Sequence, residues 1–520
     1  MKIRQNDIKK CLLWLIAIST LIRGFIAAFV EFGNDEVYYW TYALYPDWSH
    51  FDHPPMVGWM IQLFTLNLTF DSELFCRMAS VLFTAINTYV IFLIGKKIKN
   101  DTAGLFAAIL YNTSLYGFVI TGIFILPDTP LMLFLLLATY EFICYFDDDR
   151  RPRKLLLAGL FAGLAMISKY SAVFLWVGIG LYVLIYNREE LKKPFIYIAV
   201  LISMICLVPV LIWNINNDFI SFSFHGDRVG LFGEFHPEYF LREVIGEFAY
   251  NNPINFILII IALIAIFRRR FTMNDVGKRI ILLFALPFIG IFWCFSMTRE
   301  LLSHWTAPAI TFLLFIVAVY ITEKQQDKDT VIIPKGIAAS LFLLVFVMII
   351  AVTEIKTGFI DLKMTEDSRS VRYRGEGDFT MDMYGWRQMK DKFEKIRDEK
   401  IHSGEMTKDD DIIALGWYPA ANIDYYCATP LGINVLGFNN IQHLHKYSQI
   451  TKLKGGLKKN ADYWFLNDSH DYYKIENYFP KYFEEIIPTD TIAIERYGKT
   501  EKYFFVYQLK NLKEIPDFGY

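Results

Sequence analysis

The stretch CLLWLIAISTLIRGFIAAFV, residues 11–30, is an uninterrupted apolar run that follows a basic N-terminal segment. A lipid core of about 30 Å requires about 20 residues of helix, so this run predicts a membrane span. It lacks a small-residue cleavage site, and we therefore expect a retained helix rather than a signal peptide. Residues 32–55, FGNDEVYYWTYALYPDWSHFDHPP, come next and hold four carboxylates but no Lys or Arg. The missing cations are typical of an outer loop.

The composition of the whole chain agrees with a membrane protein. Of its 520 residues, 54% are hydrophobic and 17% aromatic, which is too apolar for an ordinary soluble protein. The formal net charge of -2 gives no field that favours nucleic acid. Most cysteines fall in or beside apolar segments, so a disulfide framework is not expected.

Apolar ranges recur along the first two thirds of the chain and predict about eleven spans. When the N-terminus is placed in the cytoplasm, most Lys and Arg fall in the cytoplasmic connections, as the positive-inside rule requires. An odd number of spans then places the C-terminus outside. The predicted spans are residues 11–30, 75–95, 102–121, 128–146, 154–168, 170–187, 194–213, 253–267, 279–296, 302–321 and 333–352.

The fold class expected from this pattern is a polytopic α-helical membrane protein with a C-terminal extracytoplasmic domain. The membrane part covers residues 1–355 and has two long outer loops, 31–74 and 214–252. Within the first loop, the apolar residues 56–70 predict an interfacial helix. From residue 356 to residue 520 the composition is polar, charged and aromatic, with strand-like runs between helical candidates, which favours a mixed α/β domain. Residues 418–426 and 472–483 are the helical candidates.

Carboxylates near the outer surface are the first candidates for chemistry. Asp35 and Glu36 lie just beyond the first span, and Asp52 and His53 follow in the same loop before a rigid Pro-Pro pair. Such groups suit general-base work or cation binding, although an acidic turn in solvent is the plain alternative. Asp128 begins the fourth predicted span, where it is either a helix cap or an ionisable residue with a function.

Cations on the outer side are the second group. Lys169 separates two apolar runs, where it either extends to the interface or binds a lipid phosphate. Arg228 and Arg299 are further outer cations that suit an anionic headgroup. Asp52 with His225 or His236 is a candidate divalent-metal set, without any short metal-ligand spacing in the sequence. No phosphate-binding glycine loop or nucleophile elbow is visible.

Several short motifs occur in order along the chain. They are Asp-Glu at 35–36, FDHPP at 51–55, LPD at 126–128, SKY at 168–170, SHW at 303–305 and MYGW at 383–386. This ordered set resembles the GT-C glycosyltransferases, and within them the branch of protein O-mannosyltransferases and the aminoarabinose transferases of lipid A. The resemblance covers the whole membrane part and extends loosely into the C-terminal domain.

The resemblance implies roles for individual residues. By position, Asp35 matches the base that takes the proton from an acceptor hydroxyl, Asp128 matches a second acidic position, and Glu36 supports the acceptor or the loop. Asp52 matches an acidic residue that takes part in metal binding in the lipid A branch. The next residue there is a lysine that contacts the donor phosphate, whereas this chain has His53. His53 stays a candidate for binding the donor phosphate, and Lys169 and the arginines gain weight in that role.

The expected activity is inverting transfer of a sugar from a polyprenyl-phosphate carrier to a lipid, glycan or protein on the outer face of a bacterial cytoplasmic membrane. In this scheme the leaving lipid phosphate is stabilised by cations, so a divalent metal is optional and no other cofactor is expected. The alternative is a transporter or flippase for a sugar-linked lipid. That class favours inverted repeats and a midplane site, whereas the ionisable residues here gather towards one face.

Overall fold

The computed structural model describes residues 2–148, 150–228, 234–325, 329–360, 362 and 367–518, with the side chains of residues 227, 228 and 369 excepted. Within this part the chain divides into two compact units. The first contains residues 1–28 and 46–348, and the second contains residues 29–45 and 349–520. The first outer loop is therefore shared: residues 29–45 group with the C-terminal part of the chain, and the rest of that loop groups with the membrane helices.

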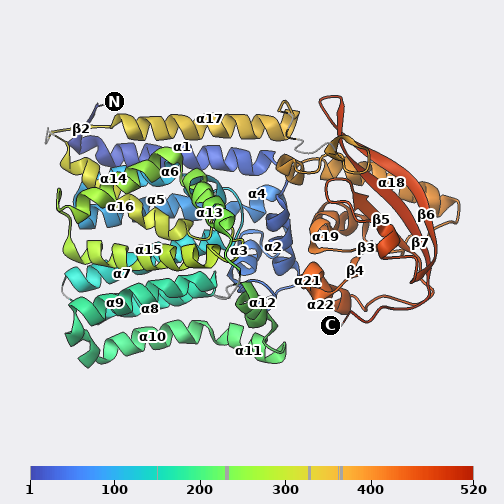
Figure 1. Ribbon diagram of the computed structural model, residues 1–520, viewed down its shortest axis with the longest axis horizontal. Helices are drawn as coiled ribbons and strands as arrows, with labels where there is room; N and C mark the ends of the chain where they lie inside the picture. Colours follow the sequence, from blue (N-terminus) through green and yellow to red (C-terminus); the bar gives the residue numbers. More distant parts are fainter. Residues whose placement is uncertain are drawn as a thin grey trace. The chain divides into compact units, whose positions relative to one another are not determined.

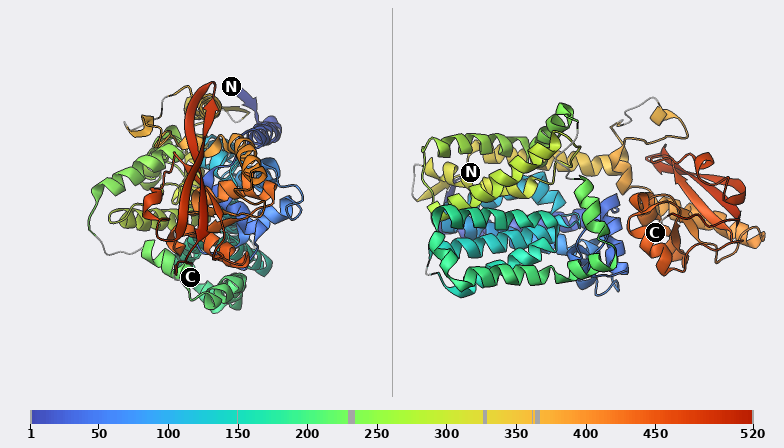
Figure 2. Two further views of the ribbon diagram at one scale, coloured as in Figure 1. Left: turned by 90° about the vertical axis from the view of Figure 1, so that its right-hand side faces the viewer. Right: turned by 60° about the horizontal axis from the view of Figure 1, so that its bottom comes forward.

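The first unit is almost entirely helical, and its helices run side by side (Figures 1 and 2). A short ladder between β1 (Lys2–Arg4) and β2 (Thr330–Ile332) ties its two chain ends together. Its helices are α1 (Ile8–Phe29), α3 (Met56–Phe64), α4 (Glu73–Cys76), α5 (Met78–Ile98), α6 (Asp101–Thr113), α7 (Asp128–Asp147), α8 (Pro152–Met166), α9 (Val173–Tyr186), α10 (Pro194–Cys206), α11 (Val208–Asn216), α12 (Ile220–Arg228), α13 (Pro237–Tyr250), α14 (Pro253–Phe267), α15 (Asp275–Ser296), α16 (Ala307–Glu323) and α17 (Lys335–Thr357).

Every apolar range that predicts a span coincides with one or more of these helices. By length and composition, five helices in the described part are able to cross a membrane, or seven if two bent helix pairs each form one span. The chain is therefore a multi-pass membrane protein, and a count of eleven stays a prediction. The remaining helices, such as α8 and α9, are too short to meet that length. A helix shorter than about 20 residues spans only where neighbouring protein shields its ends.

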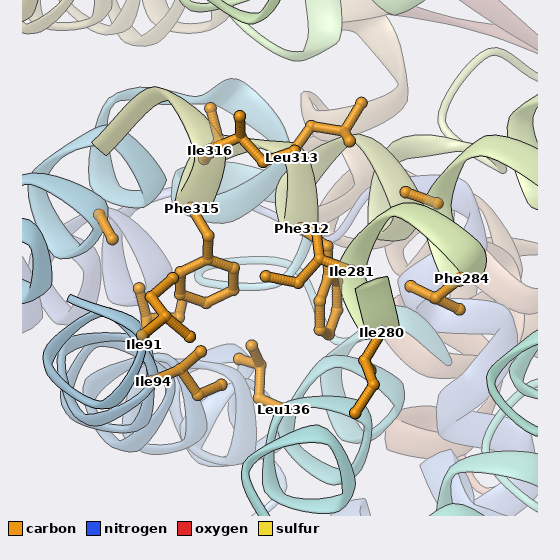
Figure 3. Close-up of a cluster of buried hydrophobic side chains, with 14 of the residues drawn as sticks. Ile91, Ile94, Leu136, Ile280, Ile281, Phe284, Phe312, Leu313, Phe315 and Ile316 are labelled. Atoms are coloured by element: carbon orange, nitrogen blue, oxygen red, sulfur yellow. The ribbon is translucent and has the colours of Figure 1, made fainter. Parts of the chain in front are cut away.

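The interior of the first unit is apolar and closely packed. Lipid tails are as apolar as Leu, so packing rather than water exclusion must hold such helices together. Small residues permit close approach: a Cβ at Gly159 of α8 would lie 2.4 Å from the Ala199 carbonyl oxygen of α10. Figure 3 shows side chains of α5, α7, α15 and α16 that converge on one cluster, namely Ile91, Ile94, Leu136, Ile280, Ile281, Phe284, Phe312, Leu313, Phe315 and Ile316.

Charges are sorted between the two ends of the helices in the first unit. Lys97 forms ion pairs with Asp147 (2.8 Å) and with Asp148, at the end of α7. Asp128 lies at the beginning of the same helix. At about 1.5 Å per residue, the two positions are roughly 30 Å apart, the thickness of a lipid core. The predicted cytoplasmic and outer charges of α7 therefore lie at opposite ends of one helix.

The second unit contains a mixed five-stranded sheet in the order β4-β3-β5-β7-β6. The strands β3 (Ile412–Ala414), β4 (Val435–Gly437) and β5 (Tyr463–Asp468) pair in parallel, and β6 (Phe483–Arg496) and β7 (Lys499–Leu512) form a long antiparallel hairpin (Figures 1 and 2). The helices of this unit are α2 (Asn34–Leu44), α18 (Trp386–His402), α19 (Trp417–Ile423), α20 (Thr429–Leu431), α21 (Ile441–Leu444) and α22 (Lys446–Leu453).

Two local predictions differ from the structure. Residues 472–483 contain only a 3-10 turn, Ile475–Asn477, before β6 begins, so the predicted helix there is wrong. Five aromatic side chains of this segment pack in or against the apolar core of the sheet, and tertiary packing overrides the helical pattern. The predicted interfacial helix at residues 56–70 is shorter than expected. It ends at Phe64, before three residues with positive φ at 66–68.

Candidate active site

Asp128 is a buried carboxylate at the first residue of α7, with only 2% of its surface exposed. Its Oδ2 accepts a hydrogen bond from Lys169 Nζ at 2.8 Å, and its Oδ1 accepts one from the Tyr116 hydroxyl at 2.9 Å. A buried carboxylate is tolerated only when it is paired and hydrogen-bonded, and both oxygens of Asp128 meet that condition. Asp128 follows the N-cap residue Pro127, and its carboxylate is engaged by Lys169 and Tyr116 instead of capping the helix.

Lys169 lies in the turn between α8 and α9. Its backbone is extended, with φ of −156°, and its N–H donates to the Ala165 carbonyl at the end of α8. The residue is 8% exposed, so its side chain points into the protein towards Asp128. The alternative that it merely extends to the membrane interface does not fit this burial. An ammonium group has three donors, and Asp128 takes one of them.

Tyr116 reaches Asp128 because the chain before α7 is not a regular α-helix. Residues Tyr116–Ile120 form one turn of π-helix. A Cβ at Gly117 would lie 2.4 Å from the Tyr111 carbonyl oxygen, so only glycine permits this close approach. From α1, the buried Arg23 donates to the Phe118 carbonyl at 3.2 Å and to Asn112 Oδ1 at 2.7 Å. Arg23 thus braces the turn that carries Tyr116.

The remainder of the first outer loop packs beside Lys169. The Met56 N–H donates to the Ile167 carbonyl at 3.3 Å, which joins the end of the FDHPP motif to the SKY turn. His53 lies within electrostatic range of Asp52, Lys169 and Asp128. Burial lowers the pKa of His53 to about 3, so this imidazole is neutral at physiological pH.

A second histidine approaches the pair from the SHW motif between α15 and α16. His304 interacts electrostatically with Lys169 and Asp128. Burial lowers the pKa of His304 to about 4, so it too is neutral. A neutral imidazole offers one N–H donor and one acceptor nitrogen. The first unit therefore brings together a buried ion pair and two neutral histidines from four separate motifs.

Of the candidate metal residues, Asp52 and His225 lie together, whereas His236 lies with another partner. Asp52 accepts from the ring of His225 through its backbone oxygen, at 2.8 Å from Nε2. His236 pairs instead with Glu238, at 2.8 Å between Nδ1 and Oε1. Within the described ranges, no group of three or more His, Cys, Asp or Glu residues is placed to hold a metal ion. Asp52 with His225 therefore stays a prediction as a metal-binding pair, and His236 is placed with Glu238.

Of the two predicted outer arginines, the structure describes the side chain of only one. The side chain of Arg228 lies outside the described residues. Arg299 is partly buried in the turn after α15, where its N–H donates to the Phe295 carbonyl at 3.0 Å. Neither residue takes part in the described contacts of Asp128. Among the predicted phosphate-binding cations, Lys169 is the one that forms the buried ion pair with Asp128.

Sequence reasoning missed two buried acids in the second outer loop. Glu243 and Glu247 lie one turn apart on α13 and are 1% and 0% exposed. Glu247 accepts from Thr306 Oγ1 at 2.6 Å and from Trp293 Nε1 at 3.0 Å. The spacing of four residues places both glutamates on one helix face and could have drawn attention to them. The same spacing is common on exposed helices, so it does not indicate burial.

Asp35 and Glu36 belong to the second unit, at the start of α2. Their environments differ sharply. Glu36 is 1% exposed, and its Oε2 accepts from the N–H of the N-cap residue Gly33 at 3.0 Å, which is the glutamate half of a capping box. Asp35 is exposed on the first turn of the same helix. Glu36 therefore supports the loop structure, and Asp35 is the carboxylate that solvent and ligands can reach.

Helix α2 is held by the C-terminal part of its own unit. The Phe32 N–H donates to the Tyr426 hydroxyl at 2.7 Å, and Asn422 Nδ2 donates to Asn34 Oδ1 at 3.0 Å. Glu31 accepts from the Trp386 N–H at 3.1 Å, which connects the loop to the MYGW motif. The sheet-containing part of the chain thus fixes the residues on either side of Asp35.

Comparisons with known proteins agree with this architecture. Residues 52–213 match the family described as Dolichyl-phosphate-mannose-protein mannosyltransferase, a range that includes Asp52, His53, Asp128 and Lys169. Two crystal structures of ArnT from Cupriavidus metallidurans, one bound to undecaprenyl phosphate and one in the apo state, share the fold with a TM-score of 0.59 at 13% identity. The bound form covers 95% of this chain and 97% of that chain, and the apo form 96% and 98%.

The chain therefore shares the fold of ArnT and, over residues 52–213, is similar to the mannosyltransferase family. The lipid A galacturonosyltransferase RgtD of Rhizobium johnstonii is 23% identical over 321 residues, which cover 60% of this chain. The match spans 65% of the length of that curated relative.

Proposed function

We propose that this chain is an inverting glycosyltransferase that moves a sugar from a polyprenyl-phosphate carrier to a lipid, glycan or protein acceptor. The site faces the outer side of a bacterial cytoplasmic membrane, with the N-terminus in the cytoplasm and the C-terminal domain outside. The observation that carries the proposal is the buried Asp128–Lys169 ion pair. The Lys169 ammonium group has two N–H donors besides the one that Asp128 accepts. Relatives of the same type act on lipid A or carry undecaprenyl phosphate.

The leaving group in this reaction is a lipid phosphate, which needs positive charge rather than a protonating acid. Asp128 holds Lys169 in a buried position, and the remaining ammonium donors bind the phosphate oxygens. The N–H of neutral His53 adds a further donor nearby. In this proposal Lys169 takes the phosphate-binding role of the lysine that the lipid A branch has at the position where this chain carries His53.

The base in this proposal is Asp35, which is exposed at the start of α2. The acceptor oxygen attacks the anomeric carbon from the face opposite the phosphate, and its proton passes to the Asp35 carboxylate. The bond from the anomeric carbon to the phosphate oxygen breaks, and its electron pair stays on the phosphate. Attack from the opposite face inverts the anomeric configuration.

Replacement of Asp35 by Asn tests this assignment. Cells that lack the gene, and cells that express the parent, Asp35→Asn or Glu36→Gln, are compared by mass spectrometry of envelope glycolipids, glycans and glycoproteins. We expect Asp35→Asn to lose the same monosaccharide as the deletion while its amount in the membrane stays normal. Glu36→Gln is the matched control, because an amide oxygen can still accept from the Gly33 N–H. Normal product from Asp35→Asn would show that Asp35 is not the base.

A further inference from the structure

Three separate segments of the second unit meet around one buried arginine. Arg496 ends β6 and is 1% exposed. Its Nη2 lies 3.0 Å from Asp378 Oδ2, and its Nη1 donates to Thr380 Oγ1 at 3.0 Å and to the Glu354 carbonyl at 3.2 Å. Gly358, with φ of +60°, passes so close that a Cβ would lie 2.4 Å from Arg496 Nε. Residues 354–358, 378–380 and 496 are thus fixed against each other.

Each of these segments presents one large apolar side chain outwards, directly beside a residue that contacts Arg496. Phe359 is 58% exposed, Phe379 is 63% exposed and Tyr497 is 82% exposed. Arg496 is itself buried and ion-paired, so the charge lies inside and the aromatic rings lie outside. A surface that faces water usually exposes its charges and buries its aromatic rings. Large exposed aromatic side chains on three segments that meet therefore indicate a surface that binds another molecule or a membrane.

The position of the three rings along the chain identifies that partner. Helix α17, Lys335–Thr357, is one of the helices able to cross a membrane, and Phe359 follows its end by two residues. Lys356 Nζ lies 4.4 Å from the centre of the Phe29 ring, and Phe29 ends the candidate span Gln5–Phe29. The ends of two spans therefore meet here, at the depth where lipid headgroups begin. Aromatic side chains and lysines favour that layer.

We propose that Phe359, Phe379 and Tyr497 form an interfacial anchor that inserts into the headgroup layer of the membrane crossed by α17. The buried Arg496 holds the three segments so that their rings are presented together. The tip of the β6–β7 hairpin then rests on the lipid, and the second unit is attached to the membrane by more than a helix end. This anchor is independent of the sugar, the acceptor and the proposed catalytic residues.

Depth-dependent quenching in the full-length protein tests the proposal. Exposed Cys294 is first replaced by Ala, and Tyr497→Cys is then labelled with a small fluorophore. The protein is placed in nanodiscs of phosphatidylethanolamine and phosphatidylglycerol, with or without lipids that carry a nitroxide near the headgroup. Glu485→Cys is the matched control, because Glu485 is exposed on the same strand as Arg496. Eleven residues of strand separate the two positions, which at about 3.3 Å per residue is roughly 36 Å.

We expect the nitroxide lipids to quench the label at position 497 at least threefold more than the label at position 485. Equal quenching at the two positions would overturn the anchor. A second variant separates anchoring from simple closeness to α17: Phe359→Ser with Phe379→Ser, both at exposed positions, is added to labelled Tyr497→Cys. We expect quenching to fall at least twofold, and unchanged quenching would show that the rings do not hold the hairpin tip on the lipid.

Discussion

The Asp128–Lys169 ion pair makes the sharpest prediction about this protein. In Lys169→Met the side chain keeps much of its length but loses its charge, so Asp128 loses the ammonium donor and keeps the hydrogen bond from the Tyr116 hydroxyl. Both side chains are nearly inaccessible, at 10% and 3% relative exposure. Removing one partner of a buried pair typically costs about 3 to 5 kcal/mol, because the other charge is left buried.

The double variant Lys169→Met/Asp128→Asn removes both charges, and its amide oxygen can still accept from Tyr116. We therefore expect its free energy of unfolding to lie within about 1 to 2 kcal/mol of the parent, since replacing a whole buried pair is often nearly neutral. The coupling energy between the two positions is then about 3 kcal/mol or more. Sugar transfer should be lost in both variants that lack Lys169, because the proposed phosphate contact needs the ammonium group.

The free energies are measured by titrating the purified protein from mild detergent into SDS and following helix content by circular dichroism. The exposed pair Lys192–Glu189, at 3.0 Å and with 73% and 74% relative exposure, is the control cycle. Exposed pairs contribute about 0.5 kcal/mol or less to coupling. If Lys169 and Asp128 coupled no more strongly than this control pair, the buried pair would not stabilise the fold.

Two further predictions concern the groups around the pair. Burial lowers the pKa of His53 to about 3 and that of His304 to about 4, whereas a histidine in the unfolded chain titrates near 6.5. The unfolded state therefore binds more protons below pH 6.5, and stability should fall as the pH drops from about 6.5 towards 4. His304→Asn should flatten that fall in melting curves at pH 7.5, 6 and 5, and an equally steep fall would contradict the role of His304. Tyr116→Phe should lower the free energy of unfolding by about 1 to 3 kcal/mol, because it removes a buried hydrogen bond to a carboxylate; a loss below about 0.5 kcal/mol in the SDS titration would contradict that bond.

The structure confirms the helical ranges of the membrane part, and the sequence also singled out Asp128 and Lys169, because apolar length and charge position are local properties. Their pairing is a tertiary property. Asp128 begins α7 and Lys169 follows α8, so an antiparallel helix pair brings both to the same end. Whether the two side chains face each other also depends on helix rotation, which neither hydropathy nor the positive-inside rule determines.

Other parts of the site could not be predicted because they depend on packing between distant segments. The sequence presents Asp35 and Glu36 as equivalent neighbours, and only the fold of α2 separates an exposed carboxylate from a buried cap. Nothing in the sequence marks Tyr116 beyond a polar hydroxyl in an apolar run. Its contact with Asp128 depends on a π-helical turn that Arg23 stabilises, and such a turn is not visible in the sequence. The SHW motif was noted, but its neutral histidine was not expected.

The packing of α2 against the C-terminal part of the chain has a consequence for protein engineering. Exchanging acceptor specificity between relatives by a single crossover at residue 349 would leave residues 29–45 behind. Phe32 and Asn34 would then meet a foreign surface in place of Tyr426 and Asn422. A functional chimera should require two inserts from the same parent, residues 29–45 together with residues 349–520, so that the segment that carries Asp35 is inherited with its own support.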